Sequence, residues 1–358
     1  MKGLAPEESS RYLSVLAELK ASCRFYDTHV HPYEVIFDRF SYDESGADSK
    51  AVSLPGRSYT AAQLSTFSFP EAVDFNETPQ AKRLQEISIM LLRKIYGSVG
   101  ERVFGDQMEV SGIDRVLLLP VATESADAGE FDSRMRWVKR LYGDLERFWI
   151  AGCIPVSLKG EEIRTYAESL QQRYGIRAIK CHPVVSALDL GSGCGKSWLE
   201  TMLAACRDLK LPVIIHGGRN NAYWGGSRGN FGSLHHLKEI DFSLCRQPVI
   251  LAHAGVHRCR LLEVEQESLP MLQKMLKTHD NLQVDVSGLG LEALKLILRR
   301  VDHDRILFGS DALYAPQWQV VTMTMHALKE LGMKWEEKFI QIASTNPQNS
   351  IFKGESHA

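Results

Sequence analysis

Residues 175–218 have the sequence GIRAIKCHPVVSALDLGSGCGKSWLETMLAACRDLKLPVIIHGG, which contains one complete strand–helix–strand unit. The two ends, 175–183 and 211–218, are short apolar runs rich in β-branched residues, and this pattern predicts buried strands. Residues 196–210 between them have the apolar periodicity of a helix. Because a helix connects the two strands, the unit predicts a parallel sheet in an α/β fold.

The same alternation extends over most of the chain. Strands are predicted at 24–31, 113–121, 149–156, 175–183, 211–218, 247–255, 281–289 and 304–312. Helices are predicted at 130–147, 161–174, 196–210, 233–246, 261–278, 290–302 and 316–331. Eight strands with helices between them favour a closed (β/α)₈ TIM barrel over an open sheet, because every strand is then buried on both faces.

One segment, 32–112, is too long for a simple connection between a strand and a helix. Its start is polar and rich in turn-forming residues, whereas 80–97 has the pattern of an amphipathic helix. We therefore expect a single barrel domain over 1–358, with 32–112 as an insertion after the first strand that is placed to cover the barrel mouth.

The composition, with 44% hydrophobic and 24% charged residues, excludes a disordered chain. The 42 Lys and Arg against 44 Asp and Glu leave a formal charge of −2, so no overall field attracts nucleic acid or an anionic membrane surface. The N-terminal residues have neither the apolar core of a signal peptide nor the roughly 20 apolar residues of a membrane span. The seven cysteines form no C-x-x-C pair. We expect a cytoplasmic protein with free thiols and a small-molecule substrate, and formation of a homo-oligomer stays open.

Polar residues follow several of the predicted strands. In a parallel barrel, catalytic side chains project from the C-terminal ends of the strands. His29 and His31 are two residues apart on the first strand, so both side chains point to the same side. The other strand ends carry Lys180, His182, His216, His253 and Asp311. Imidazole and carboxylate groups suit Zn²⁺ and related divalent ions, so the set predicts a metal centre. For His182 alone a structural role is expected, and Cys181 should point away from Lys180.

The loop GGRNNAYWGGSRGNFGS at 217–233 combines six glycines with arginine and aromatic side chains. Glycine supplies backbone freedom, and Arg219 or Arg228 can hold a substrate carboxylate by a two-pronged bond. We interpret the loop as a substrate loop or lid, with Arg219 and Trp224 as substrate contacts. The alternative is a solvent-exposed connection whose aromatic residues pack locally. No strand is followed by G-x-G-x-x-G and no Walker A lysine is present, so a nucleotide cofactor has no support.

The motifs YDTHVH, AIKCHP, VIIHGG, ILAHAG and ILFGSDA occur in this order on the predicted strands. Together they resemble the amidohydrolase superfamily of metal-dependent barrel enzymes. The closer resemblance is to the branch that contains hydrolases and the aminocarboxymuconate-semialdehyde-type decarboxylases. It extends from the first strand to STNPQNSIF at 344–352 and leaves out 32–112.

The resemblance implies roles for the residues at the strand ends. His29, His31 and His216 would bind a metal, and Asp311 would be a further ligand or the general base beside it. His253 would bind a second metal, or would hydrogen-bond the substrate or metal-bound water. Lys180 matches the position where dinuclear members carry a carboxylated lysine, but it can equally pair with a carboxylate or an anionic substrate. The number of ions therefore stays open, with Zn²⁺ the expected metal and Mn²⁺ the alternative.

These residue types predict a metal-dependent hydrolase that acts on a C–N or C–O bond of a small amide, ester or lactone. Asp311 would take a proton from water and return it to the leaving group, while His253 would stabilise the charge that develops. The alternative is non-oxidative decarboxylation, in which Asp311 or His253 protonates carbon. A non-enzymatic barrel whose metal is structural or absent is a third interpretation. It is less favoured, because structural zinc sites are normally closed by four protein ligands, often including cysteine.

Overall fold

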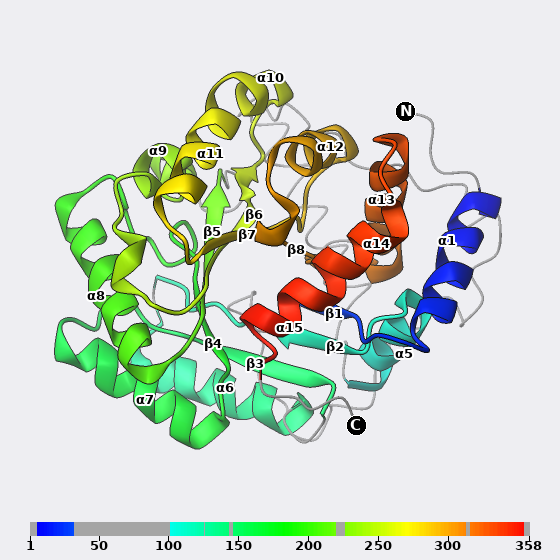
Figure 1. The fold of residues 1–358 in the computed structure, drawn as a ribbon. Helices are drawn as coiled ribbons and strands as arrows, with labels where there is room; N and C mark the ends of the chain where they lie inside the picture. Colours follow the sequence, from blue (N-terminus) through cyan, green and yellow to red (C-terminus); the bar gives the residue numbers. More distant parts are fainter. Residues whose placement is uncertain are drawn as a thin grey trace.

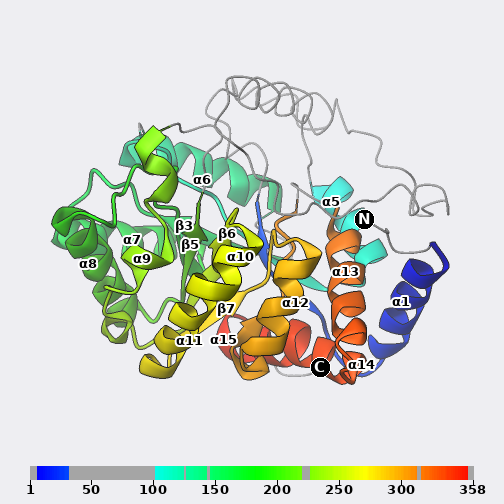
Figure 2. The same cartoon turned by 90° about the horizontal axis from the view of Figure 1, so that it is seen from above.

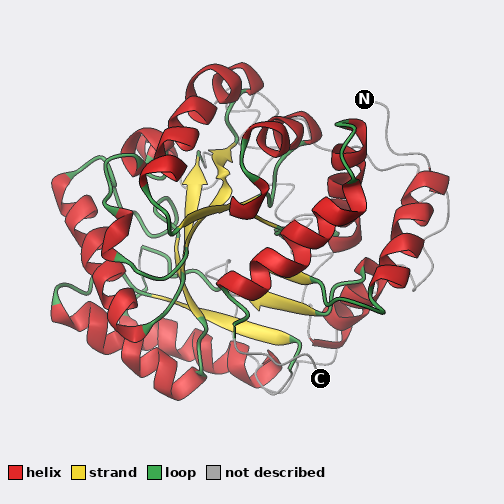
Figure 3. Cartoon of the chain, viewed as in Figure 1, coloured by secondary structure: helices red, strands yellow, loops and turns green. Residues whose placement is uncertain are grey.

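Eight parallel strands form one sheet, in which each strand lies beside its neighbours in the sequence (Figure 1). The computed structural model describes residues 6–31, 101–124, 126–142, 146–219, 226–312 and 316–353. Helices lie between the strands and surround the sheet, so the predicted TIM barrel is confirmed (Figure 3). The strands are β1 (Tyr26–Val30), β2 (Arg115–Leu118), β3 (Phe148–Cys153), β4 (Ala178–Cys181), β5 (Val213–Gly218), β6 (Val249–His257), β7 (Leu282–Asp285) and β8 (Ile306–Leu307).

The two edges of the sheet meet where the end of β8 lies against β1. The backbone N–H of Thr28 donates to the carbonyl of Phe308 at 3.0 Å. Farther along, the N–H of His31 donates to the carbonyl of Ala312 at 2.9 Å, next to a parallel bridge between Val30 and Ala312. These bonds close the sheet into a barrel, although β8 itself contains only two residues.

The helices agree with the predicted alternation except after β5. The predicted helix over 233–246 is wrong, because the Asp241 side chain accepts a hydrogen bond from the N–H of Ser243 at 3.0 Å and starts a separate 3₁₀ turn. The observed helices are α1 (Pro6–Leu19), α5 (Glu101–Ser111), α6 (Ala128–Tyr142), α7 (Glu161–Tyr174), α8 (Gly193–Leu209), α9 (Leu234–Leu237), α10 (Leu261–Glu263), α11 (Leu269–Thr278), α12 (Leu291–Arg300), α13 (Gln317–Glu330), α14 (Trp335–Ile340) and α15 (Asn346–Ser350).

Helix α5 belongs to the outer layer of the barrel. It lies at the end of the long segment 32–112 and contacts α13 (Figure 2). Its Phe104 and Met108 are buried in the main hydrophobic core. The last residues of the segment therefore form the helix that connects β1 to β2, and the helix expected at 80–97 lies outside the described residues.

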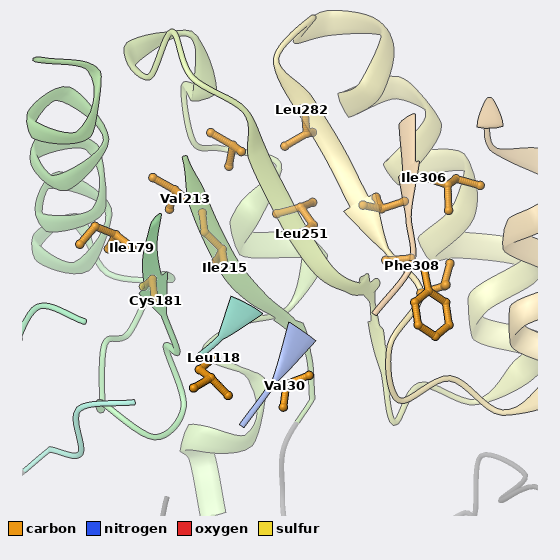
Figure 4. Packing of buried hydrophobic residues seen from close by; sticks show 14 of the residues in the cluster. Val30, Leu118, Ile179, Cys181, Val213, Ile215, Leu251, Leu282, Ile306 and Phe308 are labelled. Atoms are coloured by element: carbon orange, nitrogen blue, oxygen red, sulfur yellow. The ribbon is translucent and has the colours of Figure 1, made fainter. Parts of the chain in front are cut away.

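The core between the strands and the helices determines which side chains face the barrel interior. Ile179 and Cys181 pack with other apolar residues on the helix side of the sheet (Figure 4). Because side chains alternate along a strand, Lys180 between them points to the interior. The prediction that Cys181 points away from Lys180 is thus confirmed.

The C-terminal residues fill the opposite end of the barrel from the strand-end histidines. Phe352 is fully buried and stacks on Tyr26 of β1, with ring centroids 4.6 Å apart. It also contacts Trp149 of β3, at 4.8 Å. Asn346 fixes this segment, because its amide donates to the carbonyl of Ile306 at 2.7 Å. None of the helices in the described ranges combines the length and the apolar composition needed to cross a membrane.

Candidate metal centre

Three side chains from the closing edge of the barrel converge on one point. His29 Nε2 lies 3.1 Å from His31 Nε2 and 3.6 Å from Asp311 Oδ1, and His31 Nε2 lies 3.4 Å from the same carboxylate oxygen. All three side chains are buried. Two ligand atoms at ordinary zinc–ligand distances, separated by 90–109°, are about 2.9–3.4 Å apart. Two of the observed distances lie in this range and the 3.6 Å distance lies slightly above it, so the three atoms can form one face of the coordination shell of a divalent ion.

Hydrogen bonds on the far sides of the two rings leave the converging nitrogens available as ligands. His29 Nδ1 donates to Asp285 Oδ2 at 2.9 Å, and His31 Nδ1 donates to the carbonyl of Leu119 at 2.8 Å. Each ring then has a lone pair on Nε2, as a metal ligand requires. Burial lowers the pKa of His31 well below its ordinary value, which keeps this ring neutral.

The backbone around Asp311 has an unusual conformation that presents its carboxylate to the histidines. Asp311 has φ +57°, in the left-handed region, and its N–H donates to the carbonyl of His29 at 2.8 Å. Gly309, two residues earlier, allows the close approach. A Cβ at this position would lie 2.8 Å from His29 Cβ and 3.1 Å from Ser287 Cβ.

Asp27 fixes β1 against the end of β8, a role that the sequence analysis did not assign. Its carboxylate accepts from the N–H of His29 at 3.1 Å, from the N–H of Ser310 at 2.9 Å and from Gln317 Nε2 at 2.7 Å. Burial raises the pKa of Asp27 to about 6, although these hydrogen bonds oppose the effect. An acidic residue two positions before His29 was the available signal.

Asp285 at the end of β7 is the second carboxylate that the sequence analysis missed. Besides His29, it accepts from the N–H groups of His253 and Ser287, each at 3.0 Å, and from the Ser287 hydroxyl. Burial would raise the pKa of Asp285, but the charge and hydrogen bond of His29 lower it below its ordinary value. One ionised carboxylate therefore orients groups from β1 and β6. Its position at a strand end, within 281–289, was the signal in the sequence.

Lys180 of β4 points into the same group of donor atoms. Its side chain is fully buried, and Nζ lies 3.4 Å from His29 Nε2. Burial lowers the pKa of Lys180 to about 8, although Asp285 and Asp311 act in the opposite direction. The structure thus places Lys180 beside His29, His31 and Asp311.

His216 and His253 form a pair next to this group. His253 Nδ1 donates to the carbonyl of Ser287 at 2.8 Å, and its Nε2 lies 3.1 Å from His216 Nδ1. The ring centroids of His253 and His29 are 4.9 Å apart. His216 Nε2 is buried and has no hydrogen-bond partner in the described part of the chain. The distances thus connect His216 to the three converging side chains only through His253.

A bulge in β6 creates this pairing. His216 lies opposite Ala252, but Gly218 lies opposite His257, so four residues of β6 face the single residue Gly217 of β5. His253 is within the bulge and has φ +57°. A Cβ on Gly217 would lie 2.6 Å from the Cα of Gly255, so the bulge requires glycine here.

The remaining predicted residues lie around the centre. His182 stacks on His216 with ring centroids 3.9 Å apart, and its Nδ1 accepts from the N–H of Val185 at 3.3 Å. Both arginines of the loop are paired in this structure: Arg219 Nη2 lies 2.8 Å from Glu263 Oε1, and Arg228 binds the Glu124 carboxylate with both guanidinium nitrogens. Trp224 lies outside the described residues.

The family model for amidohydrolases matches residues 26–331. This chain belongs to the amidohydrolase family. The resemblance inferred from the strand-end motifs is therefore confirmed, and the three converging side chains form a divalent-metal site of an amidohydrolase. No curated protein matches the chain.

Solved structures share the fold with this amidohydrolase. The 5-carboxyvanillate decarboxylase of Novosphingobium aromaticivorans, complexed with manganese and 4-hydroxy-3-methoxy-5-nitrobenzoic acid, has a TM-score of 0.57 and 14% identity over 94% of this chain and 97% of that chain. The 5-carboxyvanillate decarboxylase of Sphingomonas paucimobilis has a TM-score of 0.54 and 15% identity over 93% and 100%. The IDCase of Metarhizium anisopliae in apo form has a TM-score of 0.55 and 14% identity over 92% and 97%. At these identities the likeness is one of fold.

Proposed function

We propose that this amidohydrolase is a metal-dependent hydrolase that cleaves a C–N or C–O bond of a small amide, ester or lactone. The observation that carries the proposal is the position of Lys180. Its Nζ lies 3.4 Å from His29 Nε2, so the amino group and the metal-binding nitrogen share one small, buried space.

A protonated Lys180 would repel a divalent cation bound at His29 Nε2, because both positive charges would lie in one buried site. We therefore expect Lys180 to be a neutral amine or a carbamate in the loaded enzyme. The carbamate forms when the amine nitrogen bonds to the carbon of CO₂ and one proton is released. It would offer oxygen ligands for a second ion. Two ions a few ångströms apart suit hydrolysis, since they stabilise both the attacking and the leaving oxygen.

The donor atoms fit Zn²⁺, which binds imidazole nitrogen and carboxylate oxygen. His29, His31 and Asp311 would hold the ion. His216 Nε2 is buried without a hydrogen-bond partner among the described residues, but it lies outside the group formed by these three side chains, so His216 stays a predicted ligand. Mn²⁺ is the alternative, since the Novosphingobium aromaticivorans enzyme contains it.

The side chains around the ion would have different roles in the reaction. When bound, the ion would act as a Lewis acid, which lowers the pKa of water towards about 7 and polarises a carbonyl group. Asp311 accepts the proton of the water on its carboxylate and passes it to the leaving nitrogen or oxygen. Asp285 keeps the Nδ1 proton on His29, so that Nε2 stays a ligand. Both nitrogens of His253 are engaged, by Ser287 and His216, so His253 orients His216. Its charge-stabilising role stays a prediction.

Decarboxylation is the second candidate, and the comparisons support it at least as well as hydrolysis. Two of the similar structures are decarboxylases, and the similarity extends over 93–94% of this chain. With the same ligands, Asp311 or His253 would deliver a proton to the carbon atom that loses CO₂. The choice between the two reactions depends on the substrate and not on the metal ligands.

The test uses zinc-loaded and manganese-loaded protein with a panel of amides, esters, lactones and ¹³C-carboxyl-labelled hydroxybenzoic acids. Hydrolysis predicts a new carboxylate with an amine or an alcohol, and net proton release from the esters and lactones, whereas decarboxylation predicts labelled CO₂. Asp311→Asn should abolish turnover, with Asp280→Asn as the control at an exposed carboxylate. Labelled CO₂ without hydrolysis of any panel member would replace the first proposal by the second. Full activity after rigorous metal removal would refute both.

A further inference from the structure

Helix α1 contacts helix α13 through a histidine that lies between two carboxylates. His326 of α13 is partly buried, with 17% of its side chain exposed. Its Nδ1 lies 3.7 Å from Glu8 Oε1 of α1, and its Nε2 lies 3.4 Å from Glu330 Oε1, one turn farther along α13. One imidazole ring thus connects a carboxylate of α1 with a carboxylate of α13.

The phenol of Tyr12 determines which form of this ring fits the contact on the α1 side. Tyr12 is buried, and its hydroxyl donates to Glu8 Oε1 at 3.0 Å. Burial raises the pKa of Tyr12, so the hydroxyl keeps its proton. The same hydroxyl oxygen lies 3.3 Å from His326 Nδ1. Because the hydroxyl has a single proton, which it donates to Glu8, its oxygen accepts from an N–H group at Nδ1.

The contact at Nε2 requires a second proton on the ring. A carboxylate oxygen is an acceptor, so a neutral ring with its proton on Nδ1 would present a lone pair to Glu330. A neutral ring with its proton on Nε2 would instead present a lone pair to the Tyr12 oxygen and to Glu8. The imidazolium form has protons on both nitrogens and donates on both sides. The contacts of His326 therefore fit the charged ring.

Both carboxylates keep their charge in mildly acidic solution. A hydrogen bond from Lys329, whose Nζ lies 2.7 Å from Glu8 Oε1, lowers the pKa of Glu8. Lys295 of α12 lowers the pKa of Glu330 in the same way. Two more charged residues lie beside these groups, on α1 and α12: Arg11 and Glu292. Of the residue types in this cluster, histidine is the one that ordinarily changes its charge between pH 5 and 8.

We propose that protonated His326 attaches α1 to α13, which makes the docking of α1 dependent on pH. In mildly acidic solution the ring donates to groups of both helices. At higher pH the ring loses one proton and presents a lone pair to an acceptor on one side, so α1 separates from α13 more often. Separation would expose Tyr12 and Leu16, which are buried in the core. The inference does not depend on the proposed reaction, because α1 lies at the outer edge of the molecule (Figure 1).

The test is hydrogen exchange of the full-length protein at pH 5.5 and pH 8.5, measured by mass spectrometry and corrected for the intrinsic effect of pH on exchange. Peptides from α1 should be about three- to tenfold less protected at pH 8.5, the factor for two partly exposed ion pairs. Peptides from α8 report any change in the stability of the whole barrel. His326→Gln, which is neutral at both pH values, should remove the difference in α1. The control His235→Gln, at a histidine whose side chain is 58% exposed, should keep it.

A second variant tests the same contact from the carboxylate side. Glu330→Gln replaces a side chain that is 43% exposed and should also reduce the pH difference in α1. Equal protection of α1 at the two pH values in the wild type would overturn the inference. An undiminished difference in His326→Gln or Glu330→Gln would overturn it too, because another group would then be the one that titrates. A difference that α8 shows to the same extent would mean that pH acts on the whole barrel, and the inference would be wrong.

Discussion

Asp285→Asn should weaken metal binding although it replaces none of the predicted metal ligands. The Asp285 carboxylate accepts the Nδ1 proton of His29 at 2.9 Å on one oxygen, and three donors from His253 and Ser287 on the other. An asparagine must place its NH₂ group at one of these two positions. If the NH₂ group faces His29, two donors meet, and the ring moves its proton to Nε2, where a metal ligand needs a lone pair.

The expected loss follows from this change of tautomer. Substitution of a carboxylate that orients a ligating histidine typically lowers metal affinity about 10- to 100-fold. This factor corresponds to about 1.4–2.7 kcal/mol in binding free energy. Asp285 is fully buried and binds groups from two strands, so the upper half of the range is expected.

The assay is a zinc titration of metal-free protein in competition with a chromophoric chelator. Asp280→Asn is the matched control, because its side chain is fully exposed on the chain that leads into β7. Urea unfolding of both metal-free variants separates a loss of affinity from a loss of fold. Wild-type zinc affinity in a folded Asp285→Asn protein would refute the argument that Asp285 sets the tautomer of His29.

Three further predictions concern the rest of the barrel. Phe352→Ala should lower the free energy of unfolding by about 3–5 kcal/mol, because it empties a fully buried site. Lys353→Ala at the exposed neighbour should change this free energy little, and equal urea midpoints for the two variants would contradict the role of Phe352 in filling the end of the barrel. Gly309→Ala should lower the free energy of unfolding by about 1–3 kcal/mol and weaken zinc binding, because the added Cβ would lie 2.8 Å from the Cβ of His29. Gly193→Ala is the control, because no atom lies within 4 Å of a Cβ added there. Metal-free protein should lose about 3 kcal/mol of stability through His253 between pH 6.5 and 4, because burial lowers the pKa of this ring to about 4 in the folded state, so the unfolded chain takes up a proton that the folded chain does not. Urea unfolding at pH 7 and pH 4.5 measures this loss, and His253→Gln should show a smaller pH dependence.

The barrel could be predicted from the sequence because each strand is buried on both faces. Within the predicted strand 211–218 every residue before His216 is apolar, and the structure places β5 at Val213–Gly218. The pattern of apolar residues was less informative where the backbone leaves the strand conformation. The run at 304–312 predicted a long strand, but β8 ends at Leu307, before the chain reaches the left-handed conformation of Asp311. Hydrophobicity does not report such a change of backbone conformation.

The metal site was predictable only in part. The rule that parallel strands present their C-terminal ends to one side brought His29, His31, Lys180 and Asp311 together. The pairing of His216 with His253 could not be inferred, because it depends on a bulge that shifts the register of β6 by several residues. The hydrogen bonds of Asp27 and Asp285 could not be inferred either. They connect segments that are far apart in the sequence, and the sequence does not show which residues of two such segments lie opposite each other.

The ligands lie at the junction of the first and last strands, and this placement couples metal binding to closure of the barrel. The β8 side of the junction has a two-residue strand, so backbone pairing there is short. Asp27 compensates by binding Ser310 and Gln317 beyond the end of β8. An ion held by His29, His31 and Asp311 adds another connection across the same junction. Because a ligand that binds only the folded state stabilises it by mass action, zinc should raise the free energy of unfolding. A substitution at Asp27 should lower zinc affinity and metal-free stability together, whereas Phe352→Ala at the opposite end should lower stability and leave zinc affinity unchanged.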